Sequence, residues 1–208
     1  MKTLKFFKAP FFNSYEIQKK ADQFRKRYAA AGIPVDIEDI IEFELKLGIR
    51  PVSDLYLKCN TNAYLTADCS SIVVDEGQYL NPRNLFPLRF SLAHEVGHLV
   101  LHKDIVNKFR PGSIDEWKNI MKSIPDREYG FLEYHSHEFA GRLLVPPESL
   151  ILEIGSCRAD IKRTYDQYPD ISDDLVIEYV ASKIYRKFEV SPEVIARRIK
   201  IEKVWKRP

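Results

Sequence analysis

Apolar residues recur at helical spacing along much of the chain. Ile17, Ala21 and Phe24 fall on one face of a helix, and Asn13 followed by Glu16 is the capping-box pattern that begins one. Similar patterns predict further helices, which cover residues 35–47, 88–102, 113–123 and 130–145 and a last segment from 191 onwards. The segment 88–102 is apolar almost all round, which is typical of a helix buried in a core.

Between residues 49 and 74 the helical spacing gives way to short runs rich in β-branched and aromatic residues. Asp, Asn and Gly separate these runs, which predict strands over residues 49–52, 55–58, 63–67 and 71–74. We therefore expect an α+β fold, in which N-terminal helices and a small, mostly antiparallel sheet precede the buried helix and a C-terminal helical bundle. No linker pattern is present, so residues 1–208 are predicted to form one domain, divided into an N-terminal helix (about 1–32), a core (33–155) and a helical subdomain (156–208).

Composition narrows the class of protein without identifying it. The net charge of +2 does not indicate a dedicated nucleic-acid binder. No apolar run approaches the roughly 20 residues of a membrane span, and no signal-peptide pattern opens the chain. The three scattered cysteines fit neither a disulfide framework nor a zinc ribbon. These features predict a cytoplasmic protein without a membrane partner.

All five histidines lie between residues 94 and 137, and two of them belong to an H-E-x-x-H motif, His94-Glu95-Val96-Gly97-His98. Positions i and i+4 of a helix share one stripe, so His94 and His98 can direct two imidazoles at one metal ion. Glu95 lies beside them, close enough to act on a metal-bound water. Imidazole and carboxylate ligands suit zinc, and a catalytic zinc site takes three protein ligands. The alternative is a pair of core histidines that hydrogen-bond to the backbone.

Glu133 is the favoured third ligand. On a helix over residues 130–145, Glu133 and His137 share a face with Ala140, so that this face is expected to be buried. A buried carboxylate and imidazole are costly unless something compensates them, and a metal shared with the motif would do so. His137 is the rival ligand, or a neighbour that orients one of the ligands.

The two remaining histidines are assigned supporting or surface positions. His102 lies one helical turn beyond His98, and we expect it to make a structural hydrogen bond. His135 lies about 200° around the helix from Glu133, and we expect it to face solvent.

The segment Arg89-Phe-Ser-Leu-Ala-His-Glu-Val-Gly-His-Leu-Val-Leu-His102, followed by Glu133 and by Phe139-Ala140-x-x-Leu143-Leu144-x-Pro146, resembles the ImmA/IrrE family of zinc metallopeptidases. The likeness extends over roughly residues 30 to 200. It implies a zincin-like domain with a gluzincin-like ligand set, one Zn²⁺ per chain, and a general base at Glu95. Where the family usually has Asn or Asp four residues after the ligand Glu, this chain has His137.

The resemblance also implies a function. Family members are typically regulatory endopeptidases, so we expect hydrolysis of a peptide bond in a partner protein, namely a helix-turn-helix transcriptional repressor supplied in trans. Tyr64, Tyr134 and His137 are the candidate donors to the oxyanion. The strand over residues 71–74, nearest the motif in sequence, is the candidate edge for aligning an extended substrate.

A second class of function stays open. Residues 180–203 show a helix–turn–helix pattern that carries Arg197, Arg198 and Lys200 in its second helix. The alternative is therefore a non-proteolytic regulator that binds DNA or a repressor and keeps a structural or vestigial metal site. Direct contact with nucleic acid is possible on this pattern but is not favoured, because packing helices share it.

Overall fold

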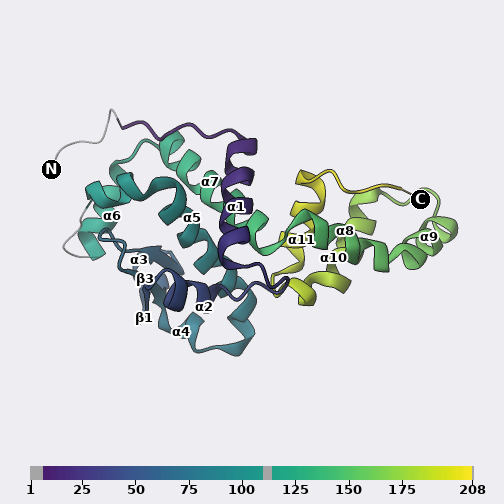
Figure 1. Ribbon diagram of the computed structural model, residues 1–208, viewed down its shortest axis with the longest axis horizontal. Coiled ribbons are helices and arrows are strands. Elements are labelled where there is room, and N and C mark those ends of the chain that lie inside the picture. Colours follow the sequence, from purple (N-terminus) through teal and green to yellow (C-terminus); the bar gives the residue numbers. More distant parts are fainter. Residues whose placement is uncertain (1–6, 110–113, 208) are drawn as a thin grey trace.

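A computed structural model describes residues 7–109 and 114–207 of the chain (Figure 1). Its N-terminal half comprises α1 (Ser14–Tyr28), α2 (Ile37–Asp39), the π-helical turn η1 (Ile40–Glu44), β1 (Gly48–Val52), α3 (Leu55–Cys59), β2 (Ala63–Leu65), β3 (Ser71–Asp75), α4 (Glu76–Tyr79) and the 3₁₀ turn η2 (Pro82–Asn84). Then follow α5 (Leu85–Phe109), α6 (Ile114–Ser123), α7 (Asp126–Leu144), α8 (Pro147–Ser156), α9 (Arg158–Gln167), α10 (Asp173–Phe188) and α11 (Pro192–Ile201). The predicted α+β class is confirmed.

The small sheet has the strand order β1-β3-β2. The central strand β3 pairs in parallel with β1 and antiparallel with β2, so the sheet is mixed rather than mostly antiparallel. All five residues of β3 are buried. The prediction that residues 71–74 form a substrate-aligning edge is therefore wrong, because both sides of that strand are already paired. The edge strand of the sheet that lies next to α5 is β2.

The predicted strand over residues 55–58 is also wrong, because this segment forms the short helix α3. The backbone N–H of Tyr56 donates to Asp75 Oδ2 over 2.9 Å, which ties the start of α3 to the end of β3. Leu55 is fully buried while Leu57 is 82% exposed. A run of only three apolar residues, Leu55 to Leu57, cannot distinguish a helix from a strand by its period alone.

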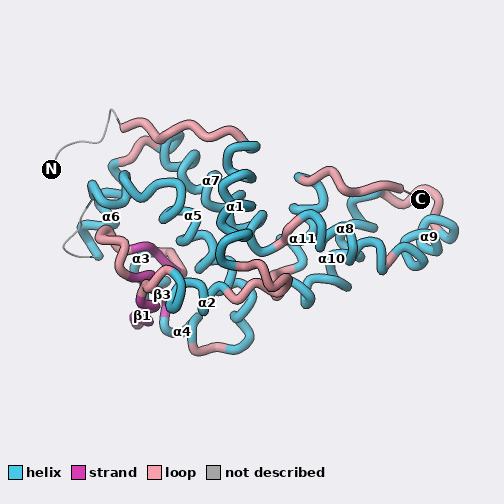
Figure 2. The backbone as a smooth tube through the Cα atoms, in the orientation of Figure 1, coloured by secondary structure: helices cyan, strands magenta, loops and turns pink. Residues whose placement is uncertain are grey.

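The helices α1, α5 and α7 form the layer that carries the core (Figures 1 and 2). The predicted capping box of α1 is confirmed, with Asn13 accepting from the Glu16 backbone and the Glu16 carboxylate accepting from the Asn13 N–H. The buried face of α1 packs on α7, where Phe24 meets Phe139 edge-to-face. On its other side, α7 packs along α5, which also contacts β2. The layer thus places α5 between the sheet and α7.

Both long helices exceed their predicted bounds. α5 continues beyond residue 102 to Phe109, and α7 begins at Asp126, before the predicted start at residue 130. The apolar pattern on which the prediction relied extends neither past residue 102 nor back before residue 130. α6 begins at Ile114, and the predicted cap at Ser113 lies outside the described residues. Within the described ranges, none of the helices combines the length and apolarity needed to cross a membrane.

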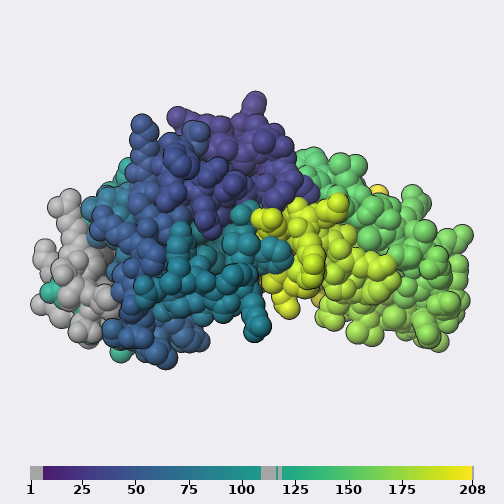
Figure 3. Space-filling view, turned by 90° about the horizontal axis from the view of Figure 1, so that it is seen from below, coloured from purple at the N-terminus to yellow at the C-terminus, as the bar shows by residue number. Residues whose placement is uncertain are grey.

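The four C-terminal helices lie on the side of the molecule away from the sheet, and Figure 3 shows the last residues, in yellow, against teal mid-chain residues. Arg89 of α5 pairs there with Glu189, the residue after α10, at 3.3 Å. The division of the chain at about residues 32 and 155 stays a prediction.

Ion pairs join α11 to α7. Arg198 is 2% exposed and pairs with Glu138, over 3.0 Å, and with Glu202. Arg197 pairs with the other oxygen of Glu138 at 2.7 Å. Arg142 completes the link by bonding Glu202. Of the three cations that the helix–turn–helix pattern offered to DNA, Arg198 is therefore buried and has no access to a phosphate, whereas Arg197 and Lys200 are exposed.

Candidate metal centre

The helices α5 and α7 bring three predicted ligands together. Within α5, the Nε2 atoms of His94 and His98 lie 3.0 Å apart. Across from them, the two carboxylate oxygens of Glu133 on α7 lie 3.3 Å from His94 Nε2 and 3.4 Å from His98 Nε2. One donor atom each from His94, Glu95 and His98 also falls within 4.8 Å of the others. The side chains that sequence reasoning assigned to one site therefore converge.

A close approach of the two helices makes this convergence possible. A Cβ atom on Gly97 would lie 3.0 Å from both the Cα and the carbonyl oxygen of Ser136. Real Cβ atoms rarely come so near to backbone, so only glycine permits this spacing between α5 and α7. The glycine of the motif thus sets the distance between the paired imidazoles and Glu133.

Glu95 points toward the sheet side of the same cluster. It is 7% exposed, and its Oε2 accepts a hydrogen bond of 2.8 Å from the backbone N–H of Leu65 in β2. Burial raises the pKa of Glu95 above its ordinary value, although the neighbouring histidines act in the opposite direction. The carboxyl group is therefore fixed in place and is a better proton acceptor than an exposed glutamate.

The charges of the cluster favour a cation between the ligands. Burial alone would raise the pKa of Glu133, but hydrogen bonds and charge from His94 and His98 hold that pKa well below its ordinary value. Burial lowers the pKa of His94, yet the hydrogen bond to Glu133 and the charges of Glu95 and Glu133 raise it overall. Two imidazoles and one carboxylate are a ligand set of catalytic zinc sites, so these residues fit zinc.

His102 makes hydrogen bonds, as predicted, and links the cluster to α7. Its Nδ1 lies 3.2 Å from Nδ1 of His98, and its Nε2 lies 3.3 Å from Nδ1 of His135. Burial and the adjacent histidines lower the pKa of His102 to about 2, so that its ring is neutral.

The prediction that His135 faces solvent is wrong, since this residue is only 1% exposed. The ring of Phe12 packs edge-on against it with 5.4 Å between ring centres. The sequence pattern treated α7 as a helix with one buried face, whereas the segment before α1 covers a further side of it.

His137 lies next to the ligand cluster. Its ring packs edge-on against Phe90 at 4.8 Å between centres, and its centre lies 6.5 Å from that of His94. Burial lowers the pKa of His137. Its ring therefore packs beside a predicted ligand.

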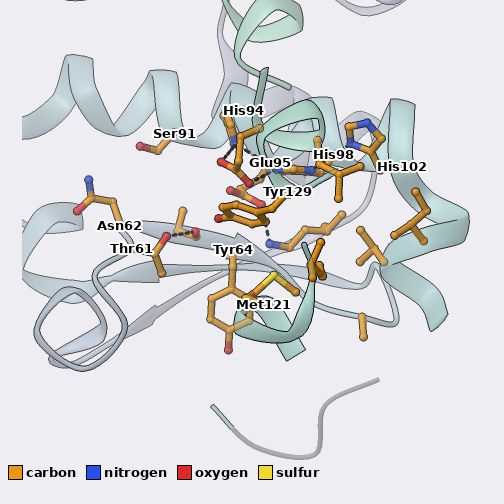
Figure 4. Close-up of a pocket in the computed structure, with 18 of the residues that line it drawn as sticks. Thr61, Asn62, Tyr64, Ser91, His94, Glu95, His98, His102, Met121 and Tyr129 are labelled. Atoms are coloured by element: carbon orange, nitrogen blue, oxygen red, sulfur yellow. Dashed lines mark hydrogen bonds and ion pairs between the residues drawn. The ribbon is translucent and has the colours of Figure 1, made fainter. Parts of the chain in front are cut away.

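A cavity of about 360 Å³ opens beside the cluster. One wall is the segment 60–67, which contains β2, and the others are α5, the end of α6 and the start of α7. Figure 4 shows the labelled His94, Glu95 and His98 on one side of the cavity. The end of the cavity beyond His98 is apolar, and its side chains are Ile105, Val106, Met121, Ile124 and Leu132. The site can therefore hold a peptide segment with a large apolar side chain.

Tyr129 is the site residue that sequence reasoning missed. It lines the cavity and hydrogen-bonds Glu133. Burial, followed by the charge of Glu133, raises the pKa of Tyr129 far above its ordinary value, so that its hydroxyl stays protonated. The sequence does carry a signal for it, because Tyr129 lies four residues before Glu133 and residues four apart share one helix face.

The two tyrosines proposed from sequence lie differently. Tyr64 lines the cavity, but its ring points away from the histidines (Figure 4). Tyr134 is 41% exposed, and its hydroxyl lies 3.4 Å from Ser14 Oγ. The next residue after Glu133 is turned about 100° around the helix, which removes Tyr134 from the site.

The fold and this site agree with the comparison against protein families. The family model Peptidase_M78, described as the IrrE N-terminal-like domain, matches residues 79–200. The match covers more than half of the chain and includes both α5 and α7. The chain therefore belongs to this family of metallopeptidases. No curated protein shows a significant match to the sequence.

Proposed function

We propose that the chain is a cytoplasmic, zinc-dependent endopeptidase of regulatory type. The observation that carries the proposal is the convergence of His94, His98 and Glu133 beside a buried Glu95. The first three would hold one zinc ion per chain. When bound, zinc lowers the pKa of a coordinated water and polarises a peptide carbonyl.

Glu95 acts as the general base. Its carboxylate takes a proton from the attacking water and returns that proton to the amine nitrogen of the scissile bond. The raised pKa favours the first half of this exchange, because the group accepts a proton more readily than an ordinary glutamate. The bond from the Leu65 N–H restrains one of its oxygens and leaves the other for the proton.

Tyr129, rather than Tyr64 or Tyr134, donates to the oxyanion. In the free protein its hydroxyl donates to Glu133, which holds it at the cluster, and the same proton would turn from Glu133 to the oxyanion as negative charge develops there. A positioned donor that meets developing negative charge stabilises the transition state more than the bound substrate.

The strand β2 aligns the substrate. Among the residues that the structure describes, it pairs with β3 alone, and it forms a wall of the cavity. An extended peptide that adds to its other side would receive backbone hydrogen bonds next to Glu95. The apolar end of the cavity favours a bulky apolar side chain in such a peptide.

We further propose that the substrate is a helix-turn-helix transcriptional repressor, in line with the resemblance to ImmA/IrrE peptidases. Burial of Arg198 takes one of the three cations of α11 out of reach of DNA, and Arg197 is paired with Glu138. The test is incubation with the repressor encoded beside the gene, with and without a chelator, followed by mass spectrometry. We expect a defined new terminus that requires zinc. A stable complex that forms without any new terminus would instead support the non-proteolytic regulator.

A further inference from the structure

Three imidazoles, of which the second and third are buried, form a continuous row that leads away from the metal cluster. His98 Nδ1 lies 3.2 Å from His102 Nδ1, and His102 Nε2 lies 3.3 Å from His135 Nδ1. The row ends at the backbone of Phe12, which hydrogen-bonds His135. His102 and His135 are 2% and 1% exposed. The row therefore connects α5, α7 and the segment before α1 inside the protein.

The protons of this row can be assigned from the atoms that face one another. A neutral imidazole has one donor and one acceptor. The Nε2 atom of His98 faces Glu133 and His94, so a metal bound there takes its lone pair and leaves the proton on Nδ1. That N–H donates to His102 Nδ1.

The order of the remaining bonds then follows ring by ring. His102 accepts at Nδ1 and donates from Nε2 to His135 Nδ1, and His135 is left with its N–H at Nε2 for the Phe12 backbone. Ser136 agrees with this order, since its hydroxyl lies 3.5 Å from His102 Nδ1 and can donate to the same acceptor.

We propose that His102 and His135 are positioning residues, which fix the tautomer and the ring plane of His98 as a metal ligand. The inference rests on the proposed metal site. In metalloproteins a carboxylate, a backbone carbonyl or water usually receives the second N–H of a ligating histidine. Here the imidazole of His102 receives that N–H and passes the hydrogen bond on to His135. The last acceptor, the backbone of Phe12, belongs to the segment before α1.

The packing around the row supports a fixed geometry. The Phe12 ring lies edge-on to His135, with 5.4 Å between centres, and 6.3 Å from His102. Gly97 and Ser136 set the close spacing of α5 and α7 at the same level. Neither imidazole can turn without breaking a hydrogen bond to its neighbour in the row.

The test compares zinc dissociation constants of the full chain, measured by competition with a chromophoric chelator. His102→Leu removes the acceptor and should weaken zinc binding about 10- to 100-fold. His102→Asn places an amide oxygen near the position of Nδ1 and should restore most of the affinity. His135→Leu should give an intermediate loss. Tyr165→Leu, which removes a buried, hydrogen-bonded ring from α9, controls for the loss of such a ring and should stay close to wild type.

A second measurement reads the protons directly. Ring-nitrogen NMR of the zinc-loaded wild type should show the proton of His98 on Nδ1 and those of His102 and His135 on Nε2. This result does not depend on whether His102→Leu folds, which circular dichroism will establish. A proton on Nδ1 of His102, or an unchanged zinc affinity in His102→Leu, would overturn the inference. A wild-type chain that binds no zinc would instead overturn the proposed function.

Discussion

Replacement of Gly97 by alanine tests how the helices create the site. The added Cβ would lie 3.0 Å from two backbone atoms of Ser136 and 3.2 Å from its Cβ. Because backbone cannot swing aside, α5 and α7 must separate by a few tenths of an ångström. Overpacking of this kind costs about 1–3 kcal/mol, and the higher helix propensity of alanine returns roughly 0.5–1 kcal/mol.

The expected net loss therefore centres on about 1–2 kcal/mol in the free energy of unfolding, within a range of roughly 0–2.5 kcal/mol. For a chain of this size it corresponds to a melting temperature lower by about 2–8 °C. The same separation moves Glu133 away from His94 and His98, whose contacts are now 3.3 and 3.4 Å. Zinc affinity should consequently fall together with stability.

The assay is thermal unfolding of the metal-free chain followed by circular dichroism, paired with zinc titration. Gly130→Ala is the matched control, because Gly130 lies exposed in α7 and an added Cβ there would meet no other atom within 4 Å. This variant should gain roughly 0.5–1 kcal/mol. If Gly97→Ala melts as high as Gly130→Ala and binds zinc equally well, the close helix contact does not set the geometry of the site.

Three further predictions follow from the same contacts. Tyr129→Phe should lower kcat by about 10²–10³-fold with little change in zinc affinity, and steady-state kinetics with unchanged kcat would remove the tyrosine from catalysis. Arg198→Met removes one of the two arginines that pair with each of Glu138 and Glu202, leaving Arg197 and Arg142, and should cost about 1.5–3 kcal/mol in a urea titration; an exposed, replaceable arginine would cost far less. The raised pKa of His94 keeps its ring protonated at a higher pH than an ordinary histidine, and a protonated ring nitrogen cannot bind zinc. Zinc affinity should therefore fall as the pH falls, and an affinity that stays constant from pH 5 to 8 would contradict this.

Local spacing was sufficient to predict the central part of the site. The i, i+4 interval of His94 and His98 places both rings on one stripe whatever the rest of the fold does. The choice of Glu133 also depended on spacing within one helix, and the structure brings it to within hydrogen-bonding range of both rings. Tyr129 obeys the same i, i+4 rule with Glu133 and was within reach of the sequence.

Features that depend on distant parts of the chain were not predictable in this way. His135 is buried because Phe12, far away in sequence, covers it. The pairing of β3 with both β1 and β2 is set by strand order, which no local pattern encodes. The burial of Arg198 needs the carboxylate of Glu138 on another helix. In each case the deciding contact is made by a residue from another element.

Zinc content and peptide hydrolysis, measured on the same samples of wild type and Glu95→Gln, test the central claim most directly. We expect close to one zinc per chain in both proteins, because Glu95 is not among the proposed ligands. We expect hydrolysis only in the wild type, abolished by a chelator and restored by zinc. A Glu95→Gln protein that retains its zinc and cleaves as fast as the wild type would contradict the proposed mechanism.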